Sequence, residues 1–84
     1  MTLTSRQLAR AVAHLEKGDW REAHDIVQRD EASSLSCWAH GIVHLMEGDI
    51  PNARYWYCEA KRDFPAKPDI AAETRALRAA IHER

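Results

Sequence analysis

The sequence predicts an all-α fold of five helices, arranged as two tandem helix-turn-helix hairpins and a C-terminal capping helix. The first observation is an internal repeat, because residues 9–23 recur thirty positions later as residues 39–53. The second is a Gly-Asp pair inside each copy, which ends one helix and begins the next. The third is the apolar pattern, which returns every three or four residues. The identical positions are Ala9/Ala39, His14/His44, Leu15/Leu45, Gly18/Gly48, Asp19/Asp49 and Ala23/Ala53.

Length and composition predict one globular domain over residues 1–84. A chain of 84 residues supports a single small core, and 45% hydrophobic with 30% charged residues excludes a disordered chain. The formal net charge of -1 provides no basic surface for a phosphate backbone, so we expect no nucleic-acid partner. The N-terminus lacks an apolar segment behind a basic flank, and no stretch is long enough to cross a bilayer. We therefore expect a soluble cytoplasmic protein that does not associate with membranes.

Capping residues mark the limits of the first hairpin. Thr4 begins a capping-box pattern, so we expect a first helix over residues 5–17. Gly18 ends this helix, and Asp19 caps a second helix that stops before the polar run 30–34. The positions expected to face the core are Leu8, Ala11, Val12 and Leu15 in the first helix and Trp20, Ala23, Ile26 and Val27 in the second.

The second hairpin has the same pattern of helix-ending and helix-capping residues. We expect a third helix over residues 35–47, which Gly48 ends. Asp49 then caps a fourth helix, with Pro51 in the first turn, where a missing backbone amide costs little.

Two prolines separate the fourth helix from the fifth. We expect the fourth helix to reach Phe64 and to end at Pro65, because a residue before proline avoids the helical conformation. After Pro68, one apolar stripe predicts a last helix with a buried face and a solvated face, as suits a terminal cap. The expected core positions are Ile50, Ala53, Tyr57, Ala60 and Phe64 in the fourth helix and Ile70, Thr74, Leu77 and Ile81 in the fifth.

The second hairpin resembles a tetratricopeptide repeat, a helix-turn-helix unit with small and aromatic residues at fixed positions. The residues that carry the resemblance are Gly41, Ala53, Tyr57, Ala60 and Pro65. In the first hairpin the match is limited to the close-packing positions Ala11 and Ala23. The resemblance implies stacked hairpins around a concave groove. The chain departs from the family at His40 and His44, which stand where the pattern places apolar and aromatic residues.

A longer string is similar to a group of small uncharacterised bacterial proteins. It has the form H-x-x-x-H-x-x-E-G-D-x-x-N-A-x-Y-W-Y and runs from His40 to Tyr57. This similarity implies that the histidines and the aromatic residues belong together, and it implies no activity.

The third helix carries residues with the spacing of metal ligands. His40, His44 and Glu47 lie at i, i+4 and i+7, so their side chains project from one narrow arc. Two imidazoles and a carboxylate occur together in zinc and iron sites, and His24 or His14 from a neighbouring helix can add a nitrogen. This alternative makes the chain a binding site for a small molecule or for a divalent transition metal such as zinc, with or without catalysis.

The same histidines also allow a structural interpretation, in which they hydrogen-bond between helices and need no ligand. Backbone carbonyls and the side chains of Asp49, Asn52 and Gln28 are the partners that the sequence offers. The H-E-x-x-H motif of zinc proteases is absent, and we assign no catalytic residue.

The opposite face of the third helix is apolar. Trp38, Ile42 and Leu45 lie on it, and two hairpins with one further helix contain little protein to cover it. On the fourth helix, consecutive aromatic residues point about 100° apart, so at least one of them points outward. Tyr55 is the outward candidate, with Trp56 beside it. These five side chains form the predicted partner surface.

The leading functional hypothesis is therefore a protein-interaction or assembly module without enzymatic activity. It binds a protein segment or a second copy of itself through aromatic side chains on a helical face. The alternative for the apolar face is that the first helix, the fifth helix or a second copy covers it.

Overall fold

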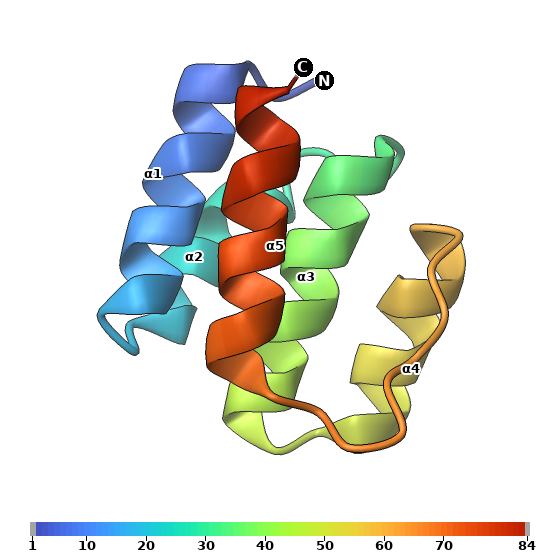
Figure 1. The fold of residues 1–84 in the computed structure, drawn as a ribbon. Helices are drawn as coiled ribbons and strands as arrows, with labels where there is room; N and C mark the ends of the chain where they lie inside the picture. Colours follow the sequence, from blue (N-terminus) through green and yellow to red (C-terminus); the bar gives the residue numbers. More distant parts are fainter. Residues whose placement is uncertain (1, 84) are drawn as a thin grey trace.

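The computed structural model describes residues 2–83, which fold into five α-helices and contain no strand (Figure 1). The predicted all-α class is confirmed. None of these helices combines the length and the apolar surface that crossing a bilayer requires. The helices are α1 (Ser5–Glu16), α2 (Trp20–Val27), α3 (Ser34–Glu47), α4 (Ile50–Glu59) and α5 (Ile70–His82).

The helices form two hairpins that share one further helix. Helix α1 packs against α2, α3 packs against α4, and α2 joins the hairpins by contacting α3. Helix α5 lies across α1 and α3 and contacts both of them (Figure 1). By contrast, the backbone of α4 packs against α3 alone among the described helices. The last helix therefore packs on both hairpins. The side of α4 that faces away from α3 is not covered by another described helix.

The two predicted corners have the same hydrogen bonds. Gly18 and Gly48 adopt left-handed φ angles of 78° and 86°, a conformation that glycine accepts without a steric cost. The amide of Asp19 donates to the carbonyl of His14 at 2.8 Å, and the amide of Asp49 donates to that of His44 at 2.9 Å. Each aspartate side chain then caps the following helix. The Gly-Asp pairs are therefore true bends, as the repeat predicts.

Helix α4 ends earlier than predicted. It stops at Glu59, and the expectation that it reaches Phe64 is wrong. Lys61 adopts a left-handed φ of 59°, and the amide of Arg62 turns back to the carbonyl of Tyr57 at 3.0 Å. This closing motif ends the helix before the prolines act on it. Ile50, expected in the core, is 40% exposed at the first turn.

The loop between the hairpins is organised around Asp30, the first residue of the polar run 30–34. Its carboxylate accepts a hydrogen bond from the amide of Leu3 at 3.0 Å, and also from the amides of Ala32 and Ser33. Burial alone raises the pKa of Asp30, but hydrogen bonds from Ser33 and from the backbone outweigh it and lower the pKa to about 2. One carboxylate therefore holds the N-terminal segment against the loop.

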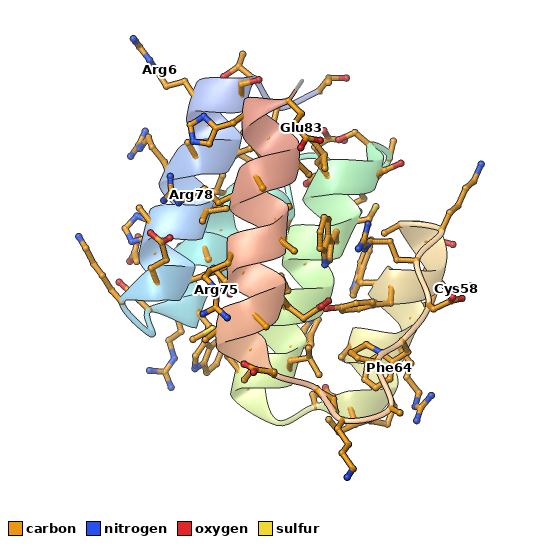
Figure 2. The ribbon with its side chains drawn as sticks, in the orientation of Figure 1. Arg6, Cys58, Phe64, Arg75, Arg78 and Glu83 are labelled. Carbon is orange, nitrogen blue, oxygen red and sulfur yellow. The ribbon has the colours of Figure 1, made fainter. Side chains whose placement is uncertain are left out.

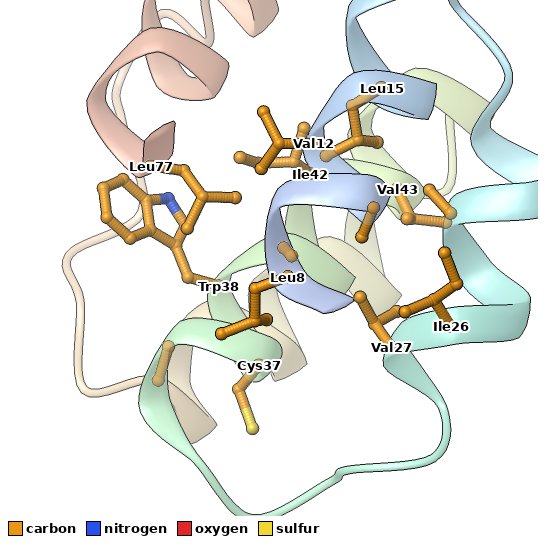
Figure 3. Close-up of a cluster of buried hydrophobic side chains, with 14 of the residues drawn as sticks. Leu8, Val12, Leu15, Ile26, Val27, Cys37, Trp38, Ile42, Val43 and Leu77 are labelled. Carbon is orange, nitrogen blue, oxygen red and sulfur yellow. The ribbon is translucent and has the colours of Figure 1, made fainter. Parts of the chain in front are cut away.

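The apolar face of α3 is buried inside the chain, which corrects the main part of the predicted partner surface. Trp38, Ile42 and Leu45 are 2%, 0% and 6% exposed. Figure 3 shows Leu77 of α5 beside the Trp38 ring, in one apolar cluster with Val12 of α1. The expectation failed because an apolar stripe shows that a face is buried, but not which element buries it.

Polar groups also attach α5 to this cluster. The carboxylate of Glu73 accepts hydrogen bonds from Trp38 Nε1 at 3.3 Å and from the hydroxyl of Tyr57. The guanidinium of Arg62 lies over the Trp38 ring, with Cζ 3.4 Å from its centroid. Because these hydrogen-bonding residues come from α3, α4 and α5, one carboxylate links three helices.

Candidate metal centre

Three histidines from two helices meet at the seam between the hairpins. His40 and His44 stand one turn apart on α3, and His24 projects from α2, which packs against α3. One ring nitrogen of each residue lies within 4.8 Å of the corresponding nitrogens of the other two. The three rings therefore form a cluster of donor atoms with the composition of a transition-metal site.

The mutual orientation of the rings is well defined. The rings of His40 and His44 are nearly parallel, with centroids 5.2 Å apart and an interplanar angle of 22°. The ring of His24 stands edge-on to both, at 4.9 Å from His40 and 5.6 Å from His44. Two nearly parallel rings and one steeply inclined ring therefore bring their donor atoms into one small region at the seam.

The close approach of α3 and α4 places an aromatic cover over the cluster. A Cβ atom added at Gly41 would lie only 2.5 Å from Cδ1 of Tyr57, so glycine is what lets the two helices come this near. Trp56 precedes Tyr57, and its ring stacks on His40 with centroids 3.8 Å apart and planes inclined by 8°. Tyr55 packs edge-on against Trp56 from the solvent side.

His40 is the most unusual member of the cluster. It is 2% exposed, and its Nδ1 atom is buried with no hydrogen-bond partner among the described residues. Burial, and then the neighbouring imidazoles of His24 and His44, lower the pKa of His40 to about 3. At neutral pH the ring is therefore uncharged and keeps a nitrogen lone pair that can bind a metal ion.

His44 is oriented by an acidic partner on its own helix. Its Nδ1 atom lies 2.8 Å from Oε1 of Glu47, which leaves Nε2 as the nitrogen available to a ligand. A carboxylate on the far nitrogen of a histidine is the usual supporting arrangement around protein-bound metals. Glu47 therefore contacts the ring of His44 on the side away from Nε2, whereas its spacing in the sequence predicts a direct ligand.

A second acidic group lies close by but is engaged elsewhere. His44, Glu47 and Asp49 also bring donor atoms within 4.8 Å of one another. However, the Asp49 carboxylate caps α4, accepting from the amide of Asn52 at 3.3 Å and from its side-chain nitrogen at 2.8 Å. We therefore treat the three histidines as the ligand set and the two carboxylates as its surroundings.

The sequence prediction and the structure agree on which histidines come together. His24, His40 and His44 meet, and His14 lies outside their cluster. The Nδ1 atom of His40 forms no hydrogen bond with Asp49, Asn52, Gln28 or a backbone carbonyl among the described residues. Of the predicted partner residues, Tyr55 is 54% exposed, whereas Trp56 is half-buried on the histidine cluster. The stacking of Trp56 on His40 was missed, because helical spacing along α4 does not reveal what faces it.

Comparisons of the chain with protein-family models, with curated proteins and with solved structures give no match. The resemblance to tetratricopeptide hairpins therefore gains no independent support from them. The candidate metal centre rests on the geometry of the histidine cluster itself.

Proposed function

We propose that this domain binds one divalent transition-metal ion, zinc foremost, through His24, His40 and His44. The observation that carries the proposal is the buried Nδ1 atom of His40, which has no hydrogen-bond partner among the described residues. Its ring lies 4.9 Å and 5.2 Å, centroid to centroid, from the imidazoles of His24 and His44. Buried polar atoms are nearly always paired, so an unpaired one beside two metal-ligating side chains indicates a missing partner.

The donor chemistry supports the same ion class. Neutral imidazoles suit zinc, copper and nickel, while magnesium and calcium prefer oxygen ligands. In tetrahedral zinc sites, Zn–N distances of about 2.0–2.1 Å separate the ligand nitrogens by about 3.3 Å. In the present structure the three nitrogens lie within 4.8 Å of one another, which is a wider spacing than a bound zinc ion requires. Small rotations of the half-buried His24 and His44 rings would bring the donors together.

Three protein nitrogens leave one position of a tetrahedral ion for water or for another small ligand. The site lies under Trp56 but is not sealed, since His24 and His44 both keep partial exposure. An ion held in this way is exchangeable, which fits a metal-binding domain better than an ion locked into the core.

Elemental analysis and calorimetry test the proposal directly. Protein purified without a histidine tag and titrated with zinc should bind about one equivalent. His44→Ala and His24→Ala should abolish this binding, because each removes one of three ligands. Glu47→Gln should weaken it about 10–100-fold, as expected for a residue that orients a ligand.

His14→Ala provides the matched control. His14 occupies the position in the first hairpin that His44 occupies in the second, but it lies outside the cluster. This variant should bind zinc like the wild type. The proposal fails if the wild type takes up no metal, or if His14→Ala loses as much binding as His44→Ala.

Self-association is a second candidate function, favoured by the outer side of α4. The backbone of this helix packs against α3 alone among the described helices, and it carries Ile50 and Tyr55, which are 40% and 54% exposed. We propose that this side is where a second copy docks, in place of the buried Trp38 face. Light scattering over a wide concentration range should show a dimer that Tyr55→Ser weakens. A monomer at every concentration contradicts this candidate.

A further inference from the structure

A cleft lies at the end of the molecule where α1 stops and α5 begins. Its volume is about 480 Å³, within the range of about 300–1,000 Å³ that small-molecule sites occupy. It is formed by the Gly18 corner, by the last turn of α3 and by the first turns of α5. The residues that line it are Leu15, Glu16, Lys17, Gly18, Met46, Ile70, Ala71, Thr74 and Arg75.

The inner part of the cleft is apolar. Leu15, Met46 and Ile70 come from three different helices and present only hydrocarbon and thioether surface. The hydroxyl of Thr74 is already satisfied, because it donates to the carbonyl of Ile70 at 2.7 Å. These side chains therefore contain no polar group that still needs a hydrogen-bond partner. A hydrocarbon chain can pack against them without leaving a buried polar group unpaired.

The rim of the cleft carries a positive balance. Arg78 reaches across from α5 and binds both carboxylate oxygens of Glu16, at 2.8 Å and 2.7 Å, which neutralises that acid. Within residues 2–83, no carboxylate pairs with Lys17 or with Arg75. Figure 2 shows Arg75 and Arg78 on the side of α5 that faces α1. Two cations without ion-pair partners therefore stand at the mouth of an apolar hollow.

The geometry points to a second site in this cleft, which binds a medium-chain aliphatic carboxylate. The alkyl chain lies on Leu15, Met46 and Ile70, and the carboxylate is held by Arg75 and Lys17. Met46 suits such an occupant, because its flexible thioether adapts to chains of different shape. This inference does not depend on the histidine cluster and stands or falls separately from it.

Chemical-shift mapping with octanoate tests this site. Gly18 lines the cleft, whereas Gly48, its counterpart in the second hairpin, does not. In ¹H–¹⁵N spectra of the whole chain, octanoate should shift the Gly18 amide in a saturable manner and leave Gly48 in place. Octanol and octylammonium should bind much more weakly, because they lack the negative charge.

Charge variants distinguish specific binding of the carboxylate from nonspecific hydrophobic binding. Arg75→Glu should weaken octanoate binding about tenfold or more, since it replaces a charge-assisted contact by repulsion. Arg6→Glu makes the same change at the other end of α1 and should have little effect (Figure 2). Both residues are exposed, and the spectra themselves report whether each variant is folded.

The inference is overturned if octanoate leaves Gly18 unshifted. It is equally overturned if octanol binds as well as octanoate, or if Arg75→Glu binds octanoate as the wild type does. Should Arg75→Glu unfold, Lys17→Glu provides the same charge test from α1.

Discussion

At the scale of single residues, His40 conflicts with the rule that buried polar atoms are paired. An unpaired buried nitrogen costs about 1–3 kcal/mol. Stacking on Trp56 offsets about 0.5–1.5 kcal/mol of this cost, in addition to what burial of the ring contributes. A ligand on the unpaired nitrogen would remove the cost itself.

Replacing His40 by an apolar residue should separate stability from binding. In the presence of a chelator, we expect His40→Leu to melt at the same temperature as the wild type or higher, because the unpaired nitrogen is gone. The same variant should lose zinc binding. Thermal melting and calorimetry measure the two effects, and a melting temperature several degrees lower would show instead that the imidazole is needed for packing.

Asp30 is a residue whose contribution depends on pH. Its pKa is about 2 in the folded chain against 3.8 as the ordinary value, so its stabilisation is complete above pH 3.8 and is lost as the pH falls toward 2. We expect Asp30→Asn to lower the free energy of unfolding by about 2 kcal/mol at neutral pH. The difference from the wild type should shrink in acid.

Urea unfolding at neutral pH and at stepwise lower pH follows this change. Asp25→Asn, an exposed substitution on α2, removes the same charge and serves as the control. A difference between Asp30→Asn and the wild type that stays constant into strong acid would speak against the pairing of the Asp30 carboxylate.

At the scale of elements, the contact between α3 and α4 depends on Gly41. Alanine at this position gains up to about 1 kcal/mol of helix propensity. Its Cβ meets the buried ring of Tyr57, however, and overpacking costs about 1–3 kcal/mol. We expect Gly41→Ala to destabilise the chain by about 1–2 kcal/mol on balance.

A double-mutant cycle identifies the cause of this loss. Tyr57→Leu removes the ring that the added methyl group meets, so Gly41→Ala should cost less in that background. Urea unfolding measures the free energy lost in each background. If Gly41→Ala lowers the free energy of unfolding equally in both, the added methyl group does not clash with the Tyr57 ring.

Much of the element structure was readable in the sequence. The corners at Gly18 and Gly48 were predicted from glycine's access to left-handed angles and from aspartate capping, and both are confirmed. The end of α4 was missed, because Lys61 adopts the left-handed conformation without the glycine that usually announces it.

The candidate site was predictable only in part. The pair on α3 follows from i, i+4 spacing, and of the two histidines that the neighbouring helices offered, His24 joins the pair and His14 does not. The role of Glu47 was not determined by spacing, since i+3 from His44 suits both a ligand and an orienting partner. The stacking of Trp56 on His40 joins two different helices, and a contact of this kind produces no periodic pattern in the sequence from which it could be predicted.

At the scale of the whole molecule, α5 decides which surfaces remain available. By covering α1 and α3 it buries the face of α3 that was predicted to bind a partner. The apolar stripe on α5 predicts that one face of the helix is buried. Where the helix packs depends on the surface that the two hairpins present together, which the sequence pattern does not show. The same packing creates the cleft beside Gly18, where α5 meets the end of α1.

The helices should also differ in local stability. Helix α3 packs against the other four helices, whereas the backbone of α4 packs against α3 alone and only the Tyr57 hydroxyl joins it to α5 by a hydrogen bond among the described residues. In native-state hydrogen exchange, we expect the amides of Ala53 and Tyr57 to exchange with a lower opening free energy than those of Ile42 and Val43. Identical opening energies in α3 and α4 would mean that the chain opens only as one unit.

The stacking of Trp56 on His40 gives the molecule an optical reporter of its own. An indole that lies flat on an imidazole loses fluorescence when that imidazole gains positive charge or coordinates a quenching ion such as copper. With the other two tryptophans, Trp20 and Trp38, replaced by phenylalanine, emission from Trp56 would follow events at the seam in real time and without any attached dye.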